Sequence, residues 1–379
     1  MKKNFNFSLT DKRIISLLSS ELFNFKTTNE VELFSNITSE DWDNMLKLSS
    51  PHSVTAILWD AIQKLSEDLH PTKMSAVKWI LSTESFEKAF SYKEKISEEV
   101  LSLFIKNNID FILIKGFGLA SYYPVAKHRR FSDIDFYPFH KTKETNNLIK
   151  KELDIKINTD SVNEDVFVYK NVLFENHVNL INTKVHKSAK NLEKHLEELA
   201  KLPSESIKLG NIVIKLPSAD FNAVFLTNHC ASHFGAAEIS LRHICDWGMF
   251  LKHEYKNINY NKVINILKEA GKYNFLLIIN NILTKHFNMN SSYSKNFIND
   301  SISENDLDHY TDKILYEILH PSFDQYNPSQ LTFLAKINFK IKRFFAGRWK
   351  YDLIYKENFY ITLIKGSFIK IIKPKRLIK

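Results

Sequence analysis

The sequence predicts an α+β fold in which a small mixed sheet is flanked by helical regions at both ends. The 379 residues include only eight glycines and nine prolines, and so few helix breakers favour helices. Apolar residues recur at helical spacing through the N-terminal quarter of the chain and again after residue 217. Between these regions, short apolar runs bounded by turn residues are typical of strands.

Residues 1–106 predict an N-terminal helical domain. Thr10 is a candidate cap for the first helix, and Ser39 for the second. Helical spacing then returns over 53–65 and continues over 75–106. These segments carry no cluster of catalytic residue types, so we interpret the region as a packing domain.

Residues 107–216 predict a small core of strands and helices. The apolar run 111–114 ends in Lys115-Gly116, which is typical of a buried strand followed by a turn. A second strand is expected over 133–137. The other elements expected here are helices over 117–123 and 142–153, strands over 166–169 and 172–180, and a hairpin over 206–216 that turns at Gly210-Asn211.

Residues 217–287 predict a C-terminal helical domain, with Ser218 as the cap of its first helix. The helices expected in it cover 219–233, 241–252 and 260–286. The stretch 288–309 is rich in Ser and Asn, which favours a polar loop. Residues 310–379 are expected to be helical again and to end in a basic amphipathic tail.

The positive charge of the chain is concentrated in this tail. The formal net charge is +9, but residues 336–379 hold 13 Lys and Arg against two acidic residues. The body is slightly acidic, which does not favour nucleic acid as a partner. The tail interleaves Phe and Ile with cations, a pattern compatible with an anionic membrane surface, with a nucleic-acid backbone, or with packing on the body.

The remaining composition points to the cytoplasm. Cys230 and Cys245 are the only cysteines and cannot build a disulfide framework, which fits a reducing compartment. Charged residues interrupt every apolar run before about 18 residues, so we expect no membrane span. The basic N-terminus lacks the apolar segment of a secretory signal. We therefore expect a cytoplasmic protein, in peripheral contact with the inner membrane face if the tail binds lipid.

Asp133 and Asp135 are the strongest candidates for a catalytic metal site. Two residues apart on a strand, they point to the same face, where two carboxylates repel unless a cation lies between them. Mg²⁺ or Mn²⁺ with the phosphates of a nucleotide would satisfy such a pair. Glu175 on a later strand is the candidate third carboxylate, as metal ligand or general base. His177 shares its face.

Candidates for phosphate binding lie between the first strand and the two aspartates. At Lys115-Gly116 a glycine lets backbone N–H groups approach a phosphate chain. Arg129 and Arg130 are cations that suit a triphosphate, and the sequence does not choose between them. Ser132, next to the first aspartate, is a further candidate for nucleotide binding.

This order of residues resembles the nucleotidyltransferases of polymerase-β-like fold. It is most similar to a subgroup with Lys-Gly at the turn, then Tyr-Pro, then Arg-x-x-x-Asp-x-Asp. Here these are Lys115-Gly116, Tyr123-Pro124 and Arg129 to Asp135. Familiar members carry Gly-Ser at the turn, so a lysine charge replaces a serine hydroxyl. The resemblance covers about residues 12–285. It implies a Mg²⁺- or Mn²⁺-dependent transfer of a nucleoside monophosphate from a nucleoside triphosphate to a hydroxyl.

The resemblance also implies that four residues of the C-terminal helices contribute to nucleotide binding. His229 and His233, four residues apart, would share one helix face. They suit a nucleotide cleft, a metal site or simple packing. Arg242 and Asp246 are also four apart and suit either a cleft or an intrahelical ion pair.

The acceptor is expected to be a small molecule, a glycan precursor or a protein hydroxyl rather than DNA or RNA. Two alternatives stay open. One is a nucleotide-binding scaffold that keeps the fold without catalysis. The other is a toxin-type enzyme that modifies a protein or a tRNA.

Overall fold

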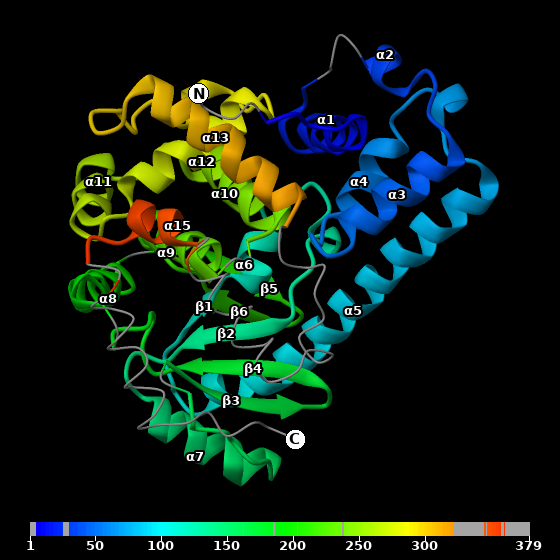
Figure 1. The fold of residues 1–379 in the computed structure, drawn as a ribbon. Coiled ribbons are helices and arrows are strands. Elements are labelled where there is room, and N and C mark those ends of the chain that lie inside the picture. Colours follow the sequence, from blue (N-terminus) through cyan, green and yellow to red (C-terminus); the bar gives the residue numbers. More distant parts are fainter. Residues whose placement is uncertain are drawn as a thin grey trace, which may run out of the picture. The chain divides into compact units, whose positions relative to one another are not determined.

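The computed structural model has the expected α+β fold and divides into two compact units (Figure 1). A sheet unit contains residues 81–225 and 256–270, and a helical unit contains residues up to 80, 226–255 and 271–357. The structure describes residues 5–25, 30–161, 163–184, 186–202, 204–236, 239–321, 345, 347–357 and 360.

The sheet unit is built on four strands, β1 (Ile112–Ile114), β2 (Asp133–Tyr137), β3 (Glu164–Tyr169) and β4 (Val172–His177). Their order in the sheet is β1-β2-β4-β3 (Figure 1). The central pair β2 and β4 is parallel, and both edge strands run antiparallel to their neighbours. The mixed sheet predicted from the sequence is therefore confirmed.

One face of this sheet is closed by an aromatic and aliphatic core. Ile134, Phe136 and Phe174 point into it from the central strands and are fully buried. The rings of Phe167 and Phe174 stack with centroids 4.9 Å apart. The C-terminal half of α5 (Lys73–Lys106) and the helix α7 (Thr142–Leu153) contribute to this core. Since alternate strand residues point to opposite faces, this core leaves the other face to polar side chains.

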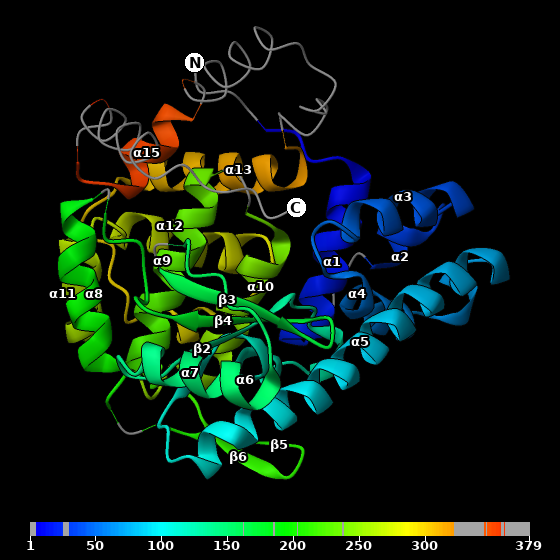
Figure 2. The ribbon, with the colours of Figure 1, turned by 90° about the horizontal axis from the view of Figure 1, so that it is seen from below.

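Further elements complete the sheet unit. After β1 come the short helix α6 (Gly116–Ala120) and the 3₁₀ turn η2 (Ala126–His128). Helices α8 (Lys187–Leu199) and α11 (Tyr260–Glu269) lie side by side (Figures 1 and 2). The hairpin of β5 (Ser206–Leu209) and β6 (Ile212–Lys215) turns at Gly210, as predicted, and Asn211 donates its backbone N–H to Glu98 on α5. Helix α8 was not predicted from the sequence.

The first and third N-terminal helices begin slightly earlier than predicted, whereas the fourth begins two residues later, at Thr55, and the second was not predicted. They are α1 (Leu9–Phe23), α2 (Glu30–Phe34), α3 (Ser39–Ser49) and α4 (Thr55–Ile62), followed by the 3₁₀ turn η1 (Glu67–Leu69). Ser8 and Thr38 are the caps, not Thr10 and Ser39. In both capping boxes an aspartate three residues later bonds back to the cap, which fixes the start of the helix.

The predicted helix over 260–286 is two helices. After α11, the chain turns at Gly271 and continues as α12 (Tyr273–Lys285). Gly271 has φ +70°, a left-handed conformation that ends a helix and that side chains with a Cβ rarely adopt. The apolar periodicity runs through this break, so it does not reveal it.

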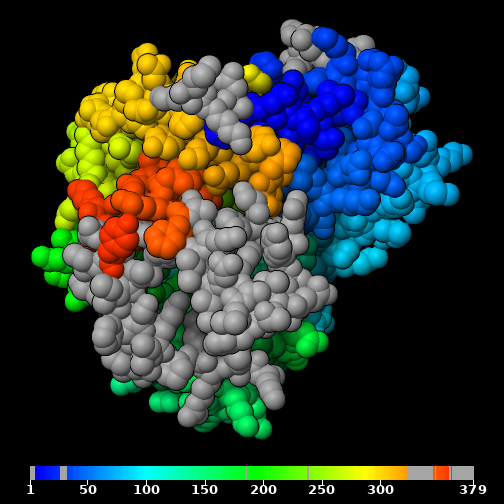
Figure 3. All heavy atoms as spheres, viewed as in Figure 1, coloured from blue at the N-terminus to red at the C-terminus, as the bar shows by residue number. Residues whose placement is uncertain are grey.

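Four further helices belong wholly or partly to the helical unit. They are α9 (Ala219–Ala236), of which residues from 226 belong here, α10 (Leu241–Glu254), α13 (Glu304–Leu319) and α15 (Arg348–Ile354). The predicted polar loop 288–309 is shorter than expected, because it holds the 3₁₀ turn η3 (Ser291–Tyr293) and α13 begins within it. In Figure 3 the red residues of α15 lie against orange α13, where Lys350 Nζ pairs with Glu317 at 2.7 Å.

Within the described ranges, no helix combines the length and the apolar character that crossing a membrane requires. Most of the basic tail 336–379 lies outside the described residues, so its role stays a prediction.

We expect Gly271→Ala to lower the free energy of unfolding by about 1–2 kcal/mol. A Cβ at this position would lie 2.8 Å from Lys356 Cγ, in addition to the strain of a positive φ. Urea denaturation of Gly271→Ala and of the double variant with Lys356→Ala separates the two contributions, because the second substitution removes Cγ and leaves the backbone strain. Wild-type stability of the single variant would contradict the left-handed turn.

Candidate active site

The pairing of two parallel strands brings the predicted acidic residues together. Asp135 on β2 is in register with Glu175 on β4. Asp133 lies two residues before Asp135, and His177 lies two residues after Glu175. Because side chains alternate along a strand, all four share the face opposite the aromatic core.

Asp135 is the buried centre of this group. It is 1% exposed, and its Oδ1 lies 3.0 Å from Lys115 Nζ and 3.0 Å from His177 Nε2. Burial by itself opposes ionisation, but the lysine charge and the histidine hydrogen bond outweigh it. The pKa of Asp135 is therefore well below its usual range, and the carboxylate is ionised.

Both ring nitrogens of His177 lie against acceptor oxygens, an arrangement that favours the doubly protonated ring. Its Nδ1 lies 3.2 Å from the backbone carbonyl of Asn179, which can only accept, and its Nε2 faces the Asp135 carboxylate. Burial would lower the pKa of His177, but the hydrogen bond and charge of Asp135 raise it above its usual value. His177 therefore acts as a cation beside Asp135.

The ionisation of Glu175 is hindered by its burial and by the neighbouring carboxylates. Burial raises its pKa, and the negative charges of Asp135 and Asp133 raise it further, to about 8. The Lys115 ammonium only partly offsets these effects. A carboxyl that is hard to ionise among other carboxylates is typical of a site that a cation completes.

Lys115 reaches Asp135 because of an unusual backbone conformation. It has φ 56° and ψ −125°, and Gly116 follows with φ 37°. A positive φ is strained for a lysine, and such strain is found where the surroundings impose it. The ion pair with Asp135 is a role for Lys115 that the sequence did not reveal.

Arg129 forms a hydrogen bond with the backbone of the same turn. It is 3% exposed, and its Nη1 donates to the carbonyl oxygen of Gly116 at 3.0 Å. Arg130 instead stacks its guanidinium over the ring of Phe86, 5.1 Å from the centroid. Ser132 Oγ donates to Asp133 Oδ1 at 3.1 Å. Of the two arginines, Arg129 is thus the one that contacts the Lys115-Gly116 turn.

The basic segment 127–130 also lines a cavity of about 180 Å³ against α5. Its wall combines cations with aromatic rings: Ser85, Phe86, Ala89, Phe90, Lys93, Lys127, Arg129, Arg130 and Phe131. No acidic side chain is among these lining residues. Lys93 also donates to the backbone carbonyl of Phe131. A small cavity with four cationic side chains suits an anionic group such as phosphate.

A comparison with known protein families gives a match that includes the sheet unit's strands and the residues of this site. A family model described as an uncharacterised nucleotidyltransferase matches residues 38–288, which is more than half of the sequence. The chain belongs to this family. No curated protein and no solved structure gave a match in the same comparisons.

The donor set on this face of the sheet fits a hard divalent cation. One carboxylate oxygen of Asp135 lies within 4.8 Å of one of Glu175. Asp133 adds a carboxylate on the same face. Carboxylate oxygens are the ligands that Mg²⁺ and Mn²⁺ prefer, and a divalent charge would relieve the repulsion that raises the pKa of Glu175.

The four residues expected from the C-terminal helices belong to the helical unit of the nucleotidyltransferase. His229 and His233 on α9 are neighbours, with ring centroids 4.5 Å apart, as the spacing predicts. Arg242 and Asp246 lie on α10. The sequence missed His243, also on α10, which joins the two histidines. Its place one residue after Arg242 gives no spacing signal, because the contact is between helices.

We expect Glu175→Gln to stabilise the metal-free protein at alkaline pH. The pKa of Glu175 is about 8 in the folded protein, above its ordinary value of 4.5, so the protonated carboxyl favours the folded state. Its contribution to the free energy of unfolding is complete below pH 4.5. This stability is lost as pH rises through about 8. Glutamine cannot ionise and should gain about 2–4 kcal/mol over wild type at pH 9.

Urea denaturation with a chelator, at pH 4.5 and pH 9, measures this difference. Glu205→Gln, an exposed position in the same unit, is the matched control and should follow wild type at both pH values. A Glu175 variant that is less stable than wild type at pH 9 would show that the carboxylate is favourably placed in the metal-free fold.

Proposed function

We propose that the chain is a Mg²⁺- or Mn²⁺-dependent enzyme that transfers a nucleoside monophosphate from a nucleoside triphosphate to a hydroxyl acceptor. The observation that carries the proposal is the face shared by Asp133, Asp135 and Glu175 beside the Lys115-Gly116 turn. Three carboxylates, a cationic turn and membership of a nucleotidyltransferase family together support phosphoryl-transfer chemistry.

Asp133 and Asp135 would hold the divalent cation, which would neutralise phosphate charge when bound. The hydroxyl oxygen of the acceptor would attack the α-phosphorus, and the bond to the bridging oxygen would break to release pyrophosphate. Glu175 would accept the hydroxyl proton. Its pKa is raised in the metal-free protein, and a bound cation would lower it toward the range of a general base at neutral pH.

Lys115 and Arg129 would serve the phosphates. In the metal-free protein the lysine ammonium neutralises Asp135. With a divalent cation held by the carboxylates, the ammonium would be available to pair with a phosphate oxygen. Arg129 keeps the turn in place through Gly116, and the cavity that it lines with Arg130 offers further cationic contacts. A hydroxyl of a small molecule, a glycan precursor or a protein remains the proposed acceptor, in the cytoplasm.

A nucleotide-binding scaffold is the second candidate, and the Lys115–Asp135 ion pair favours it. In that pair the Lys115 ammonium, 3.0 Å from Asp135, already neutralises the most buried carboxylate of the site without a metal. The two functions differ in turnover and not in the ability to bind a nucleotide.

Label transfer from each α-labelled nucleoside triphosphate, with Mg²⁺ and a cell extract, tests catalysis. We expect one nucleotide to label an acceptor, and Asp135→Asn and Asp133→Asn to reduce labelling by at least about 100-fold. Asp160→Asn, an exposed position of the same unit, should label like wild type. Circular dichroism shows whether each variant is folded.

Equal labelling by Asp135→Asn would refute the assigned chemistry. Nucleotide binding without labelling under any condition would favour the scaffold.

Lys115→Met should separate the two roles of the lysine. Without the ammonium, Asp135 and Glu175 repel more strongly, so Mn²⁺ measured by electron paramagnetic resonance should bind more tightly. Nucleotide affinity, measured by calorimetry, should fall by about 10-fold because a phosphate loses a charged partner. Lys208→Met, an exposed position on β5, is the control. Weaker binding of both ligands would mean that Lys115 only maintains the fold of the turn.

A further inference from the structure

We infer that His229, His233 and His243 form a binding site for a transition-metal cation of the Zn²⁺ type. The three residues belong to the helical unit and are distinct from the carboxylate site of the sheet unit. The inference does not depend on the proposed nucleotidyl transfer.

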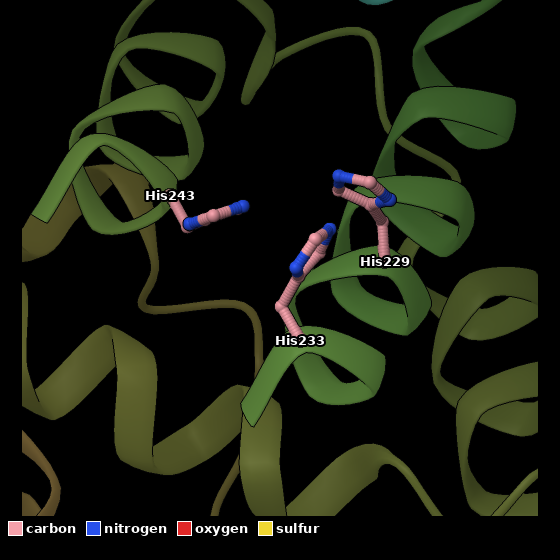
Figure 4. Close-up of side chains that lie close together, drawn as sticks. All are labelled: His229, His233 and His243. Atoms are coloured by element: carbon pink, nitrogen blue, oxygen red, sulfur yellow. The ribbon is translucent and has the colours of Figure 1, made fainter. Parts of the chain in front are cut away.

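Two helices bring the three imidazoles together. His229 and His233 are one turn apart on α9, and His243 lies near the start of α10. The centroid of the His233 ring is 4.5 Å from that of His229 and 4.6 Å from that of His243. Figure 4 shows the rings pointing toward a common centre.

The distances are close to those of a metal-bound set. One nitrogen from each ring lies within 4.8 Å of the other two. Zn²⁺ binds imidazole nitrogen at about 2.0–2.1 Å, so three ligands of a tetrahedron lie about 3.3 Å apart. Binding would require rotations about the side-chain bonds of the three residues to bring the nitrogens to that separation.

The chemistry of the donors selects the class of cation. Three imidazoles offer only nitrogen, which suits Zn²⁺, Co²⁺, Ni²⁺ and Cu²⁺ and does not suit Mg²⁺. Three histidines also leave a fourth tetrahedral position for water or an anion. His229 and His233 are partly exposed, so this position has access to solvent.

Ser240 fixes the orientation of the most buried ligand. His243 is 8% exposed, and its Nδ1 lies 3.0 Å from both the backbone nitrogen and the Oγ of Ser240 at the start of α10. This holds Nδ1 at the helix end. In the metal-free protein Nδ1 accepts the backbone N–H of Ser240, so the proton of the neutral ring is on Nε2. Binding of a cation through Nε2 would displace that proton or shift it to Nδ1, which would exchange the bond from the Ser240 N–H for one donated to Ser240 Oγ, a typical support for a ligating histidine.

Metal titration of the full-length, chelator-treated chain tests the site. Co²⁺ is added first, its visible absorption reports tetrahedral coordination, and Zn²⁺ is then added to displace it. We expect one tetrahedral Co²⁺ per chain, and a loss of its affinity of at least about 100-fold in His233→Gln and His243→Gln. Ser240→Ala should lose about 10-fold. His253→Gln, an exposed position on the same helix, should bind the tetrahedral Co²⁺ like wild type.

Chemical modification of wild type tests the site without a variant that could misfold. Zn²⁺ should protect His229, His233 and His243 from an acylating reagent and leave His253 reactive. Absence of a tetrahedral Co²⁺ spectrum, equal affinity in the histidine variants, or no protection of the partly exposed His229 and His233 would each overturn the assignment and leave the three as packing residues.

Discussion

Repulsion among carboxylates on one face of a small sheet is the constraint to which the surrounding structure responds. The register of β2 and β4 places Asp135 beside Glu175, with Asp133 two residues away. Lys115 and His177 neutralise Asp135, and Glu175 remains protonated up to about pH 8. The face therefore reaches a stable charge state without metal, but the carboxyl group of Glu175 stays available to a stronger cation.

This charge arrangement depends on rigid supports outside it. Phe136 and Phe174 anchor the two central strands from the opposite face, so the carboxylates cannot move apart without disturbing a packed aromatic core. Arg129 holds Gly116 and thereby the strained conformation of Lys115. A lysine that holds a positive φ to reach its partner is under backbone strain, and in the proposed function this strain would favour its release when a cation neutralises that partner.

The sequence predicted the parts of this site that follow from local pattern. Strand 133–137 and helix 142–153 have the bounds that were expected, because alternation and turn signals at their ends are clear. The sequence did not predict the ion pair between Lys115 and Asp135, because this pair depends on a rare backbone conformation of Lys115. The break at Gly271 was missed because buried residues continue on both sides of it. Helix α8 could have been found, since Leu192, Leu196 and Leu199 are buried at helical spacing.

The histidines of the two units differ in what their nitrogens can bind. His177 lies among metal-ligating carboxylates, yet both of its nitrogens face acceptors, the Asn179 carbonyl and Asp135. A nitrogen that carries a proton has no lone pair for a metal, so a doubly protonated His177 leaves this group with carboxylate oxygens as its donors. Oxygen donors favour Mg²⁺ or Mn²⁺, whereas nitrogen donors attract Zn²⁺. The hydrogen bond from His177 to Asp135 thus does more than balance charge, because it keeps an imidazole nitrogen out of a donor set that suits Mg²⁺ or Mn²⁺.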